Sequence, residues 1–367
     1  MEENMKVKDI VKVLDQWCPP NLAYEWDNVG LLVGDRSQEV RKVYISLDVT
    51  DQAIEMAKAA HADMIITHHP LLFQSVKKIH TDDFITNRVI QLLKNDIASY
   101  AMHTNYDICR MADVSGKYLE LTNQRSLEIE HTEKVYKVAV YVPVDHEEEV
   151  AKGMADAGAG AIGEYSDCSF RIQGEGTFKP LPGTHPFIGT IGEMERVNEV
   201  KIETVVSESN LNKVLETMVN IHPYEEPAYD VYELKKEVNP KGIGKIGQLP
   251  KKMTLKDTAL YVKEKFSLES VRVYGNLDEI LETVAILPGS GKSYIDSVLR
   301  TKATGYITGD ITHHDGIDAV ARGLNIIDAG HYGIEHIFIE DVKNKLMESF
   351  EGLEVLTEKI SHPFQVL

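Results

Sequence analysis

The chain has 367 residues, of which 43% are hydrophobic and 26% are charged. This composition is ordinary for a globular protein, and the length allows two or three domains with a substantial core. The formal net charge at pH 7 is −19. Non-specific binding to nucleic acid or to an anionic membrane needs a positive surface, so neither is expected as a partner.

The cysteines and the N-terminus indicate a cytoplasmic protein. Cys18, Cys109 and Cys168 are isolated in the sequence, and they suggest neither a disulfide framework nor a thiolate zinc site. The N-terminal residues lack the apolar segment of a signal peptide, and no apolar stretch approaches membrane-spanning length. We therefore expect a cytoplasmic location.

The N-terminal part of the chain predicts alternating strands and helices. The expected elements are a strand at 43–47, a helix at 51–60, a strand at 64–66, a helix at 84–95 and a strand at 97–102. The second strand runs into Thr67–Pro70 and the third into His103–Asp107, and both segments contain histidine. The carboxyl ends of strands are where α/β sheets form their sites.

The C-terminal part predicts a similar order of elements. The expected elements are a strand at 283–287, a helix at 293–302, a strand at 305–308, a helix at 316–322 and a strand at 325–328. The second strand again leads to a Thr-His-His sequence, so His313 and His314 are expected at the repeat position of His68 and His69. The two parts therefore predict similar α/β halves whose strand ends meet in one cleft.

Between these halves, residues 133–237 predict a smaller inserted domain. The expected elements are strands at 136–142, 201–206 and 229–234, a helix that starts at 145–149 and a helix at 209–220. Strands that alternate with two helices over about 100 residues are typical of an α+β, ferredoxin-like fold. The fold class is therefore α/β: one outer metal-binding domain, with halves at 1–132 and 238–367, is interrupted by this insert.

The strongest candidates for metal binding are His331 and Glu335. They lie one helical turn apart and share an apolar, core-facing stripe with Ile334 and Phe338. An ionised glutamate on such a face is costly unless it is paired or bound to a cation. The alternative is a partly exposed pair near a helix N-terminus.

His68 and His69 form a second candidate pair. Adjacent strand residues point to opposite faces, so both can serve one site only if the strand ends in a turn, which Pro70 favours. Alone, the histidines of such a dipeptide are more often surface residues or hydrogen-bonded residues than metal ligands. Imidazole and carboxylate donors without thiolates are the ligand set of a divalent ion such as Zn, Mn, Fe or Ni.

Further polar residues are candidates for supporting roles. His103 precedes Asp107 by four residues and is expected to be a general base, a partner of a ligand, or simply a hydrogen-bonded histidine. The other candidates near strand ends are Asp48, Asp310, His313 and His314. The last two are expected to line the cleft or contact substrate, with a plain polar loop as the alternative.

Two further segments are given structural interpretations. Pro288–Ser293 ends like a Walker A loop, but Ile286 occupies the position of its first glycine, so an NTPase is not expected. A helix beginning after Gly291 could still hold an anion such as phosphate. In the insert, Tyr224–Glu226 is expected to form a solvated turn or an oligomer contact.

Four segments together resemble the Nif-three-like (YbgI/YqfO) dinuclear metal centre family, many of whose members are labelled GTP cyclohydrolase 1 type 2 homologues. The segments are Tyr24–Gly34, Thr67–Pro70, His103–Asp107 and Gly330–Glu335. The insert, with its His-Pro-Tyr-Glu-Glu-Pro sequence, resembles the CutA/PII-like insert of the longer members. The resemblance implies two divalent metal ions per subunit, and it places their ligands at His68, His69, Asp107, His331 and Glu335. It also implies a homohexamer built of trimers.

Two classes of function follow. The first is a metal-dependent hydrolase, of cyclohydrolase or phosphoester type, that acts on a nucleotide-like small molecule, with His103 as the catalytic proton shuttle and Glu335 or Asp107 as the bridging carboxylate. The second is a non-enzymatic metal-binding or regulatory oligomer. Five ligands shared by two ions leave coordination positions open, which favours catalysis over a closed structural site.

Overall fold

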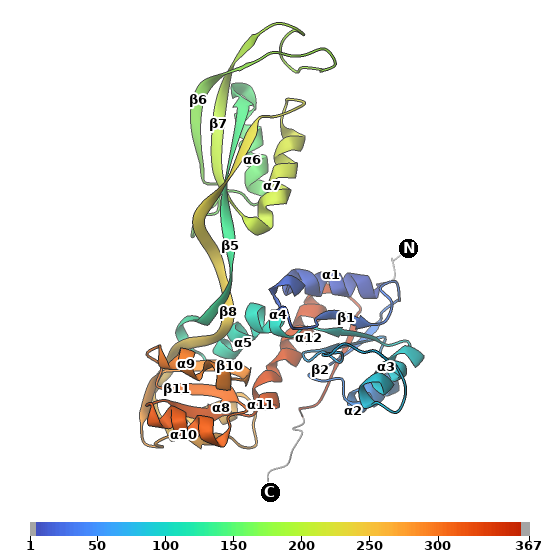
Figure 1. Cartoon of the computed structure of the whole chain (residues 1–367), viewed down its shortest axis with the longest axis vertical. Helices are drawn as coiled ribbons and strands as arrows, with labels where there is room; N and C mark the ends of the chain where they lie inside the picture. The colour runs from blue at the N-terminus through green and yellow to red at the C-terminus, as the bar shows by residue number, and fades with distance from the viewer. Residues whose placement is uncertain (1–4, 361–367) are drawn as a thin grey trace. The chain divides into compact units, whose positions relative to one another are not determined.

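The computed structural model describes residues 5–360, which form two compact units. The discontinuous unit contains the residues up to Glu130 and those from Lys241 onwards, and the inserted unit is His131–Pro240. The chain passes between the units within two long strands, β5 (Thr122–Pro143) and β8 (Tyr229–Thr254) (Figure 1). None of the helices among the described residues is long and apolar enough to cross a membrane.

The first sheet of the discontinuous unit has five strands in the order β1-β4-β3-β2-β13. Their bounds are β1 Gly30–Val33, β2 Lys42–Ser46, β3 Met64–Thr67, β4 Ala98–Ala101 and β13 Glu354–Thr357. All neighbours are parallel except β1, which runs antiparallel to β4. Every residue of β3 is buried, as expected for a parallel strand that is covered on both faces.

Helices cover both faces of this sheet. The bounds are α1 Val7–Trp17, α2 Asp51–Ala59, α3 Phe84–Lys94 and α12 Ile337–Ser349. Ile65 packs with α2 and α3, whereas its neighbours Met64 and Ile66 pack with α1 and α12. Successive residues of a strand point to opposite faces, so one short apolar run supplies two cores.

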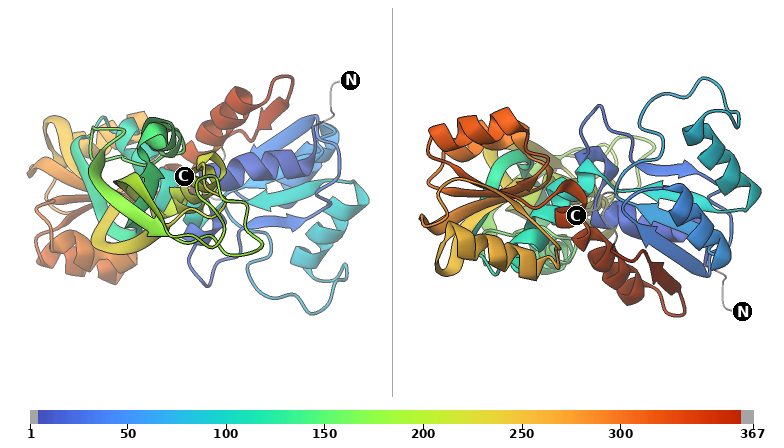
Figure 2. Two further views of the ribbon diagram at one scale, coloured as in Figure 1. Left: turned by 90° about the horizontal axis from the view of Figure 1, so that it is seen from above. Right: turned by 90° about the horizontal axis from the view of Figure 1, so that it is seen from below.

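The second sheet of the discontinuous unit follows the same plan, in the order β8-β10-β11-β12-β9. The bounds are β9 Arg272–Tyr274, β10 Ile280–Ser290, β11 Gly305–Gly309 and β12 Asn325–Asp328, with helices α8 Leu255–Lys265, α9 Ile295–Leu299 and α10 His313–Ala321. Strands β10, β11 and β12 are parallel, and β9 is antiparallel to β12 as β1 is to β4. Figure 2 shows the two sheets, one coloured blue to cyan and the other orange.

One hydrophobic core joins the two sheets of this unit. It contains Ile45 and Met64 from the first sheet and Ile307 and Ile327 from the second. Phe338 of α12 is fully buried in the same core. This shared core holds the carboxyl ends of both sets of parallel strands in a fixed relation.

The inserted unit is ferredoxin-like. Its elements are β5, α6 (Glu147–Asp156), β6 (Ser169–Phe178), β7 (Glu195–Ser207), α7 (Glu208–Ile221) and β8. The strand order β6-β7-β5-β8 is that of a split β-α-β arrangement. Val138, Val140 and Val142 pack against Val150 of α6 and Val214 of α7. The predicted fold class is therefore confirmed, with two similar α/β halves and a ferredoxin-like insert.

Three expectations in the C-terminal half are wrong. The helix expected at 293–302 is a short 3-10 turn followed by α9, which has only five residues. Strand β10 continues to Ser290, and only the three-residue 3-10 turn Lys292–Tyr294 begins after Gly291, so the α-helix N-terminus considered as an anion site is not found at this place in the described chain. Helix α10 starts at His313, three residues earlier than expected, because the Thr312 hydroxyl accepts a hydrogen bond from the Asp315 backbone N–H and caps the helix.

Candidate metal centre

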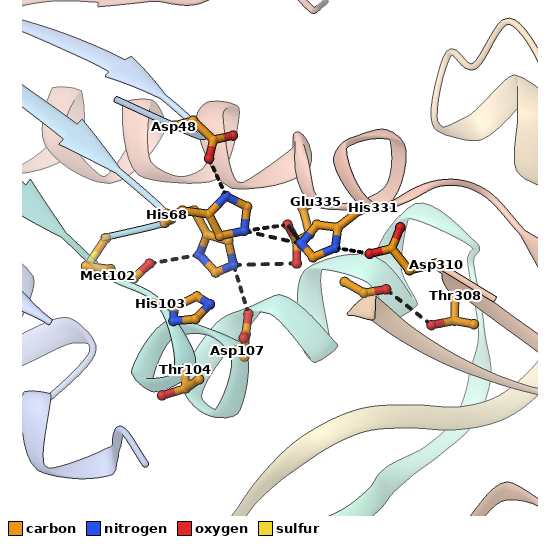
Figure 3. A network of polar contacts seen from close by, with 12 residues as sticks. Asp48, His68, Met102, His103, Thr104, Asp107, Thr308, Asp310, His331 and Glu335 are labelled. Carbon is orange, nitrogen blue, oxygen red and sulfur yellow. Dashed lines mark hydrogen bonds and ion pairs between the residues drawn. The ribbon is translucent and has the colours of Figure 1, made fainter. Parts of the chain in front are cut away.

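Side chains from both sheets of the discontinuous unit converge at the strand ends (Figure 3). His68 and His69 lie in the bend after β3, and His103 follows β4. Asp107 begins a π-helical segment, Asp107–Met111, which follows the short helix α4 (Thr104–Tyr106). From the second sheet, α11 (His331–Glu335) follows β12 and contributes its first and last residues.

Glu335 lies at the centre of the cluster and is 3% exposed. The interatomic distances are 3.7 Å from its Oε1 to His68 Nε2, 3.2 Å from its Oε2 to His69 Nε2, and 3.1 Å from its Oε2 to His331 Nε2. His69 Nε2 and His331 Nε2 are 3.3 Å apart, and His68 Nε2 is 3.3 Å from Asp107 Oδ1. The five side chains that the sequence suggested as ligands are therefore neighbours in space.

Three buried atoms in this cluster have no hydrogen-bond partner among the described residues. They are His68 Nε2, Asp107 Oδ1 and Glu335 Oε2. Leaving a buried polar atom unpaired costs roughly 1–3 kcal/mol, and more when the group is charged. A cation bound to these atoms would remove that cost, and imidazole and carboxylate are suitable donors for a divalent metal.

The donor atoms form two overlapping groups that could each hold a metal ion. One contains His68, His69 and His103, and the other contains His69, His331 and Glu335; within each group the donor atoms lie within 4.8 Å of one another. His103 therefore lies among the candidate ligands and is not remote from them.

Each of the four histidines in the cluster is oriented by a hydrogen bond at Nδ1. The contacts are His68 with the Met102 carbonyl at 2.8 Å, His69 with Asp48 at 3.0 Å, His103 with Asp27 at 2.9 Å and His331 with Asp310 at 2.8 Å. An imidazole that donates from Nδ1 keeps the Nε2 lone pair for a metal, and such partners also fix the ring orientation. Each of the four rings is therefore held through Nδ1, which leaves Nε2 as the candidate donor atom for a cation.

The charges in the cluster depend on one another. Burial raises the pKa of Glu335, but His68 and His331 outweigh this effect and hold the pKa well below its ordinary value. Burial lowers the pKa of His68, whereas Asp107 and Glu335 raise it well above the usual range. The pKa of His331, also lowered by burial, is raised by Glu335 to about 9. The imidazoles and the buried carboxylate thus stabilise each other's charged forms.

Glycines allow the backbone to approach the cluster closely. A Cβ atom at Gly289 would lie 2.5 Å from Glu335 Oε1, and one at Gly309 would lie 2.7 Å from the His331 backbone nitrogen. At Gly330 the requirement for glycine is conformational. Nothing lies within 4 Å of its Cβ position, but its φ of +74° is unfavourable for other residues. The close approach of backbone to the cluster therefore occurs at Gly289 and Gly309 and not at Gly330.

The comparison with the sequence predictions gives one correction and one omission. His313 and His314 do not take the repeat position of His68 and His69; they are exposed in the first turn of α10 and belong to neither donor group among the described residues. The omission is Asp27, which holds His103. Asp27 lies in the Tyr24–Gly34 segment, but no spacing within that segment shows that it reaches residue 103.

Comparisons with known proteins give consistent results. A model of the Duf34/NIF3 (NGG1p interacting factor 3) family matches residues 5–363. A Bacillus subtilis protein named GTP cyclohydrolase 1 type 2 homolog is 41% identical over 348 residues, covering 94% of this chain and 93% of its own. The crystal structure of a Bacillus cereus protein related to NIF3 matches with a TM-score of 0.91 and 38% identity over the full length of both chains. A Staphylococcus aureus structure, also covered in full, gives a TM-score of 0.78 at 29% identity.

Proposed function

Because this chain belongs to the Duf34/NIF3 family, we propose that it is a metal-dependent hydrolase that acts on a nucleotide-like small molecule. The proposed ligands of two divalent cations are His68, His69, Asp107, His331 and Glu335. The observation that supports this proposal best is the set of three buried atoms that have no hydrogen bond within the described part of the chain but lie within ion-pair distance of other candidate ligands, namely His68 Nε2, Asp107 Oδ1 and Glu335 Oε2. Glu335 is the proposed bridging carboxylate, because its two oxygens face histidines of different donor groups.

The two cations would polarise a carbonyl or phosphoryl oxygen of the substrate and lower the pKa of an attacking water. The proton from that water is assigned to His103. Its Nδ1 hydrogen-bonds to Asp27, and hydrogen bonds from His103 and Thr104 lower the pKa of Asp27 to about 2 despite the opposing effect of burial. The ionised carboxylate holds the tautomer in which Nε2 can accept a proton.

Exposed aromatic rings beside His103 support a nucleotide-like substrate. Trp26 is 57% exposed and Phe73 is 52% exposed, although both are large and apolar. Their ring centroids lie 6.1 Å and 6.5 Å from the His103 ring, and 5.8 Å from each other. Exposed aromatic faces are suited to stacking on a planar base. The acidic chain favours a small substrate over a long polyanion.

The same proposal includes the assembly. We propose a closed homohexamer built of trimers, as the family resemblance implies and as symmetric closure favours. Light scattering coupled to size-exclusion chromatography measures the mass directly. A monomer at micromolar concentration would contradict the assembly without affecting the proposed metal ligands.

The chemistry is tested on protein purified without chelator. Metal analysis should find two divalent ions per chain, and protein loaded with Mn or Zn should turn over at least one member of a panel of nucleotides and phosphoesters. Asp107→Ala should lose both metal and turnover, whereas His103→Gln should retain at least one ion and lose most turnover. If metal is bound but no substrate responds, the non-enzymatic, regulatory role replaces the hydrolase.

A further inference from the structure

The inserted unit contains a cavity of about 420 Å³ that the metal centre does not use. Its walls come from the end of β6, the segment between β6 and β7, and the Tyr224–Glu226 segment. The cavity volume lies in the range of small-molecule sites. Its lining combines aromatic rings with carboxylates, and these define what it could bind.

Glu199 of β7 is the buried carboxylate of this cavity, with 9% exposure. Its Oε1 accepts a hydrogen bond from the Tyr224 hydroxyl at 2.9 Å. Its Oε2 lies over Gly176, where any side chain would collide with it. A carboxylate oxygen accepts more than one hydrogen bond, so a positioned Glu199 can still receive donors from a ligand.

Tyr224 is itself fixed by the sequence around it. His222 is largely buried, and its Nε2 donates to the Tyr141 carbonyl at 3.0 Å. Its Nδ1 therefore accepts from the Tyr224 backbone N–H, also at 3.0 Å. Both nitrogens of this imidazole are used in positioning, so the His-Pro-Tyr-Glu-Glu-Pro sequence builds a wall of the cavity. In the segment expected to be a solvated turn or an oligomer contact, Glu225 and Glu226 are exposed, whereas Tyr224 is half-buried and hydrogen-bonded to Glu199.

Aromatic rings form the apolar part of the cavity. The Phe178 and Tyr224 centroids are 5.7 Å apart, and Phe187 lies 6.4 Å from Tyr224. Phe187 is 54% exposed, which leaves a ring face available at the opening. A hydrogen bond connects the segment that carries Phe187 to the Tyr224–Glu226 segment: the His185 backbone N–H donates to the Glu225 carboxylate at 2.9 Å.

The charge of the lining excludes one class of ligand. Glu199, Glu225 and Glu226 line the cavity, and the described lining residues include no lysine or arginine. A phosphate group would meet repulsion here without a compensating cation. An uncharged or cationic group with N–H donors would pair with the carboxylates instead.

We propose that this cavity binds a planar nitrogen heterocycle whose edge presents two adjacent N–H donors, as guanine does, with the donors on Glu199 and the ring against Tyr224 and Phe187. A carboxylate receives such a pair of donors in a bidentate geometry, and the rings supply stacking. The site lies wholly within the inserted unit, and it stands whether or not the metal centre hydrolyses a substrate.

Calorimetric titration of the full-length, metal-loaded protein with nucleosides tests this proposal. Guanosine offers both donors, inosine offers one, and adenosine lacks the pair. Affinity should therefore fall from guanosine to inosine by at least fivefold, and adenosine should bind weakest. Equal affinities for guanosine and adenosine would overturn the assignment, as would the absence of guanosine binding.

Variants locate the binding. Glu199→Gln keeps the size but replaces one acceptor oxygen, and it should weaken guanosine binding at least tenfold. Phe187→Ala removes a ring that is more than half exposed, and it should weaken binding at least fivefold. Glu233→Gln, at a surface pair with Lys134, is the matched control and should bind as the parent does.

A final variant separates the cavity from the metal centre. Glu335→Gln should leave guanosine affinity unchanged, because the cavity does not include the metal ligands. A large loss in this variant would place the nucleoside at the metal centre and overturn the cavity site. Unchanged guanosine binding in both Glu199→Gln and Phe187→Ala would do the same.

Discussion

The two sheets of the discontinuous unit can be compared at the ends of β3 and β11. Thr67 and Thr308 correspond, because the carbonyl of each accepts a backbone hydrogen bond from the residue after the next strand, Met102 and Ala329, at 2.9 and 2.8 Å. The residues that follow are His68 and His69 in the first sheet but Gly309 and Asp310 in the second. The same place in the topology thus carries two candidate ligands in one sheet and none in the other.

The difference has a steric cause. A side chain at Gly309 would collide with the backbone of His331, whose ring enters the cluster from α11. The second sheet therefore contributes donors from the helix after β12, and Asp310 supports one of them. Shared topology fixes where strand ends lie, whereas close packing decides which of them can carry a ligand.

The largest effect on metal binding is expected at Glu335, whose carboxylate contacts histidines that follow strands of both sheets. Glu335→Gln should lower metal affinity on the order of a hundredfold or more and remove at least one ion, because the amide cannot supply the negative charge. Elemental analysis after dialysis measures this. Glu340→Gln, at an exposed pair on α12, is the control and should retain full occupancy. Full occupancy in Glu335→Gln would show that the ligand assignment is wrong.

Adding a side chain at Gly309, where the second sheet carries no candidate ligand, should destabilise the protein. Gly309→Ala should lower the free energy of unfolding by about 1–3 kcal/mol, because the added Cβ overlaps backbone atoms that cannot move freely. Thermal unfolding with and without metal measures the change. Gly174→Ala is the matched control, since nothing lies within 4 Å of its Cβ position. A stable Gly309→Ala protein would remove the steric explanation.

The aspartates that hydrogen-bond to His69 and His331, one following a strand of each sheet, should have similar effects on metal affinity. Asp48→Asn and Asp310→Asn should each weaken metal binding about 10–100-fold, because each aspartate orients an imidazole through Nδ1. Competition with a chelator gives the affinities. An effect in one variant only would mean that a single sheet controls the centre.

Metal affinity should rise with pH. Burial lowers the pKa of His331, but Glu335 outweighs this effect and raises the pKa to about 9, so the imidazole is protonated at neutral pH and must lose that proton to bind a metal through Nε2. Affinity should increase about tenfold per pH unit for each proton displaced, up to about pH 9. Titrations in buffers of different ionisation enthalpy count the released protons. A pH-independent affinity between pH 6 and 8 would contradict this.

The smallest effect is expected at the histidines of α10. His314→Ala should leave metal content unchanged, since this exposed residue lies outside the two donor groups. Metal content is measured in His314→Ala and, in parallel, in His69→Ala, which should lose metal. Loss of metal from His314→Ala would restore the simple repeat alignment of the two Thr-His-His sequences.

The sequence was informative where apolar runs and helical spacing determine structure. The strand at 325–328 is found at those residues, and the contact of half-buried His331 with buried Glu335 follows from their i, i+4 spacing. The apolar pattern alone places the start of α10 three residues too late, because the Thr312 cap determines where this helix begins. The contact of Asp27 with residue 103 depends on tertiary packing, which no local pattern contains.

The π-helical segment that begins at Asp107 has a consequence for how relatives should be aligned. A π-turn accommodates one residue more than an α-turn, so Asp107–Met111 is equivalent to a regular helix with a single-residue insertion. Removing that residue would rotate Asp107 by about 100° relative to the following helix, α5 (Ala112–Tyr118), and turn its carboxylate away from His68. In an alignment, a one-residue gap at this place would mark a protein whose centre has lost this donor, even where an aspartate is still written in the column.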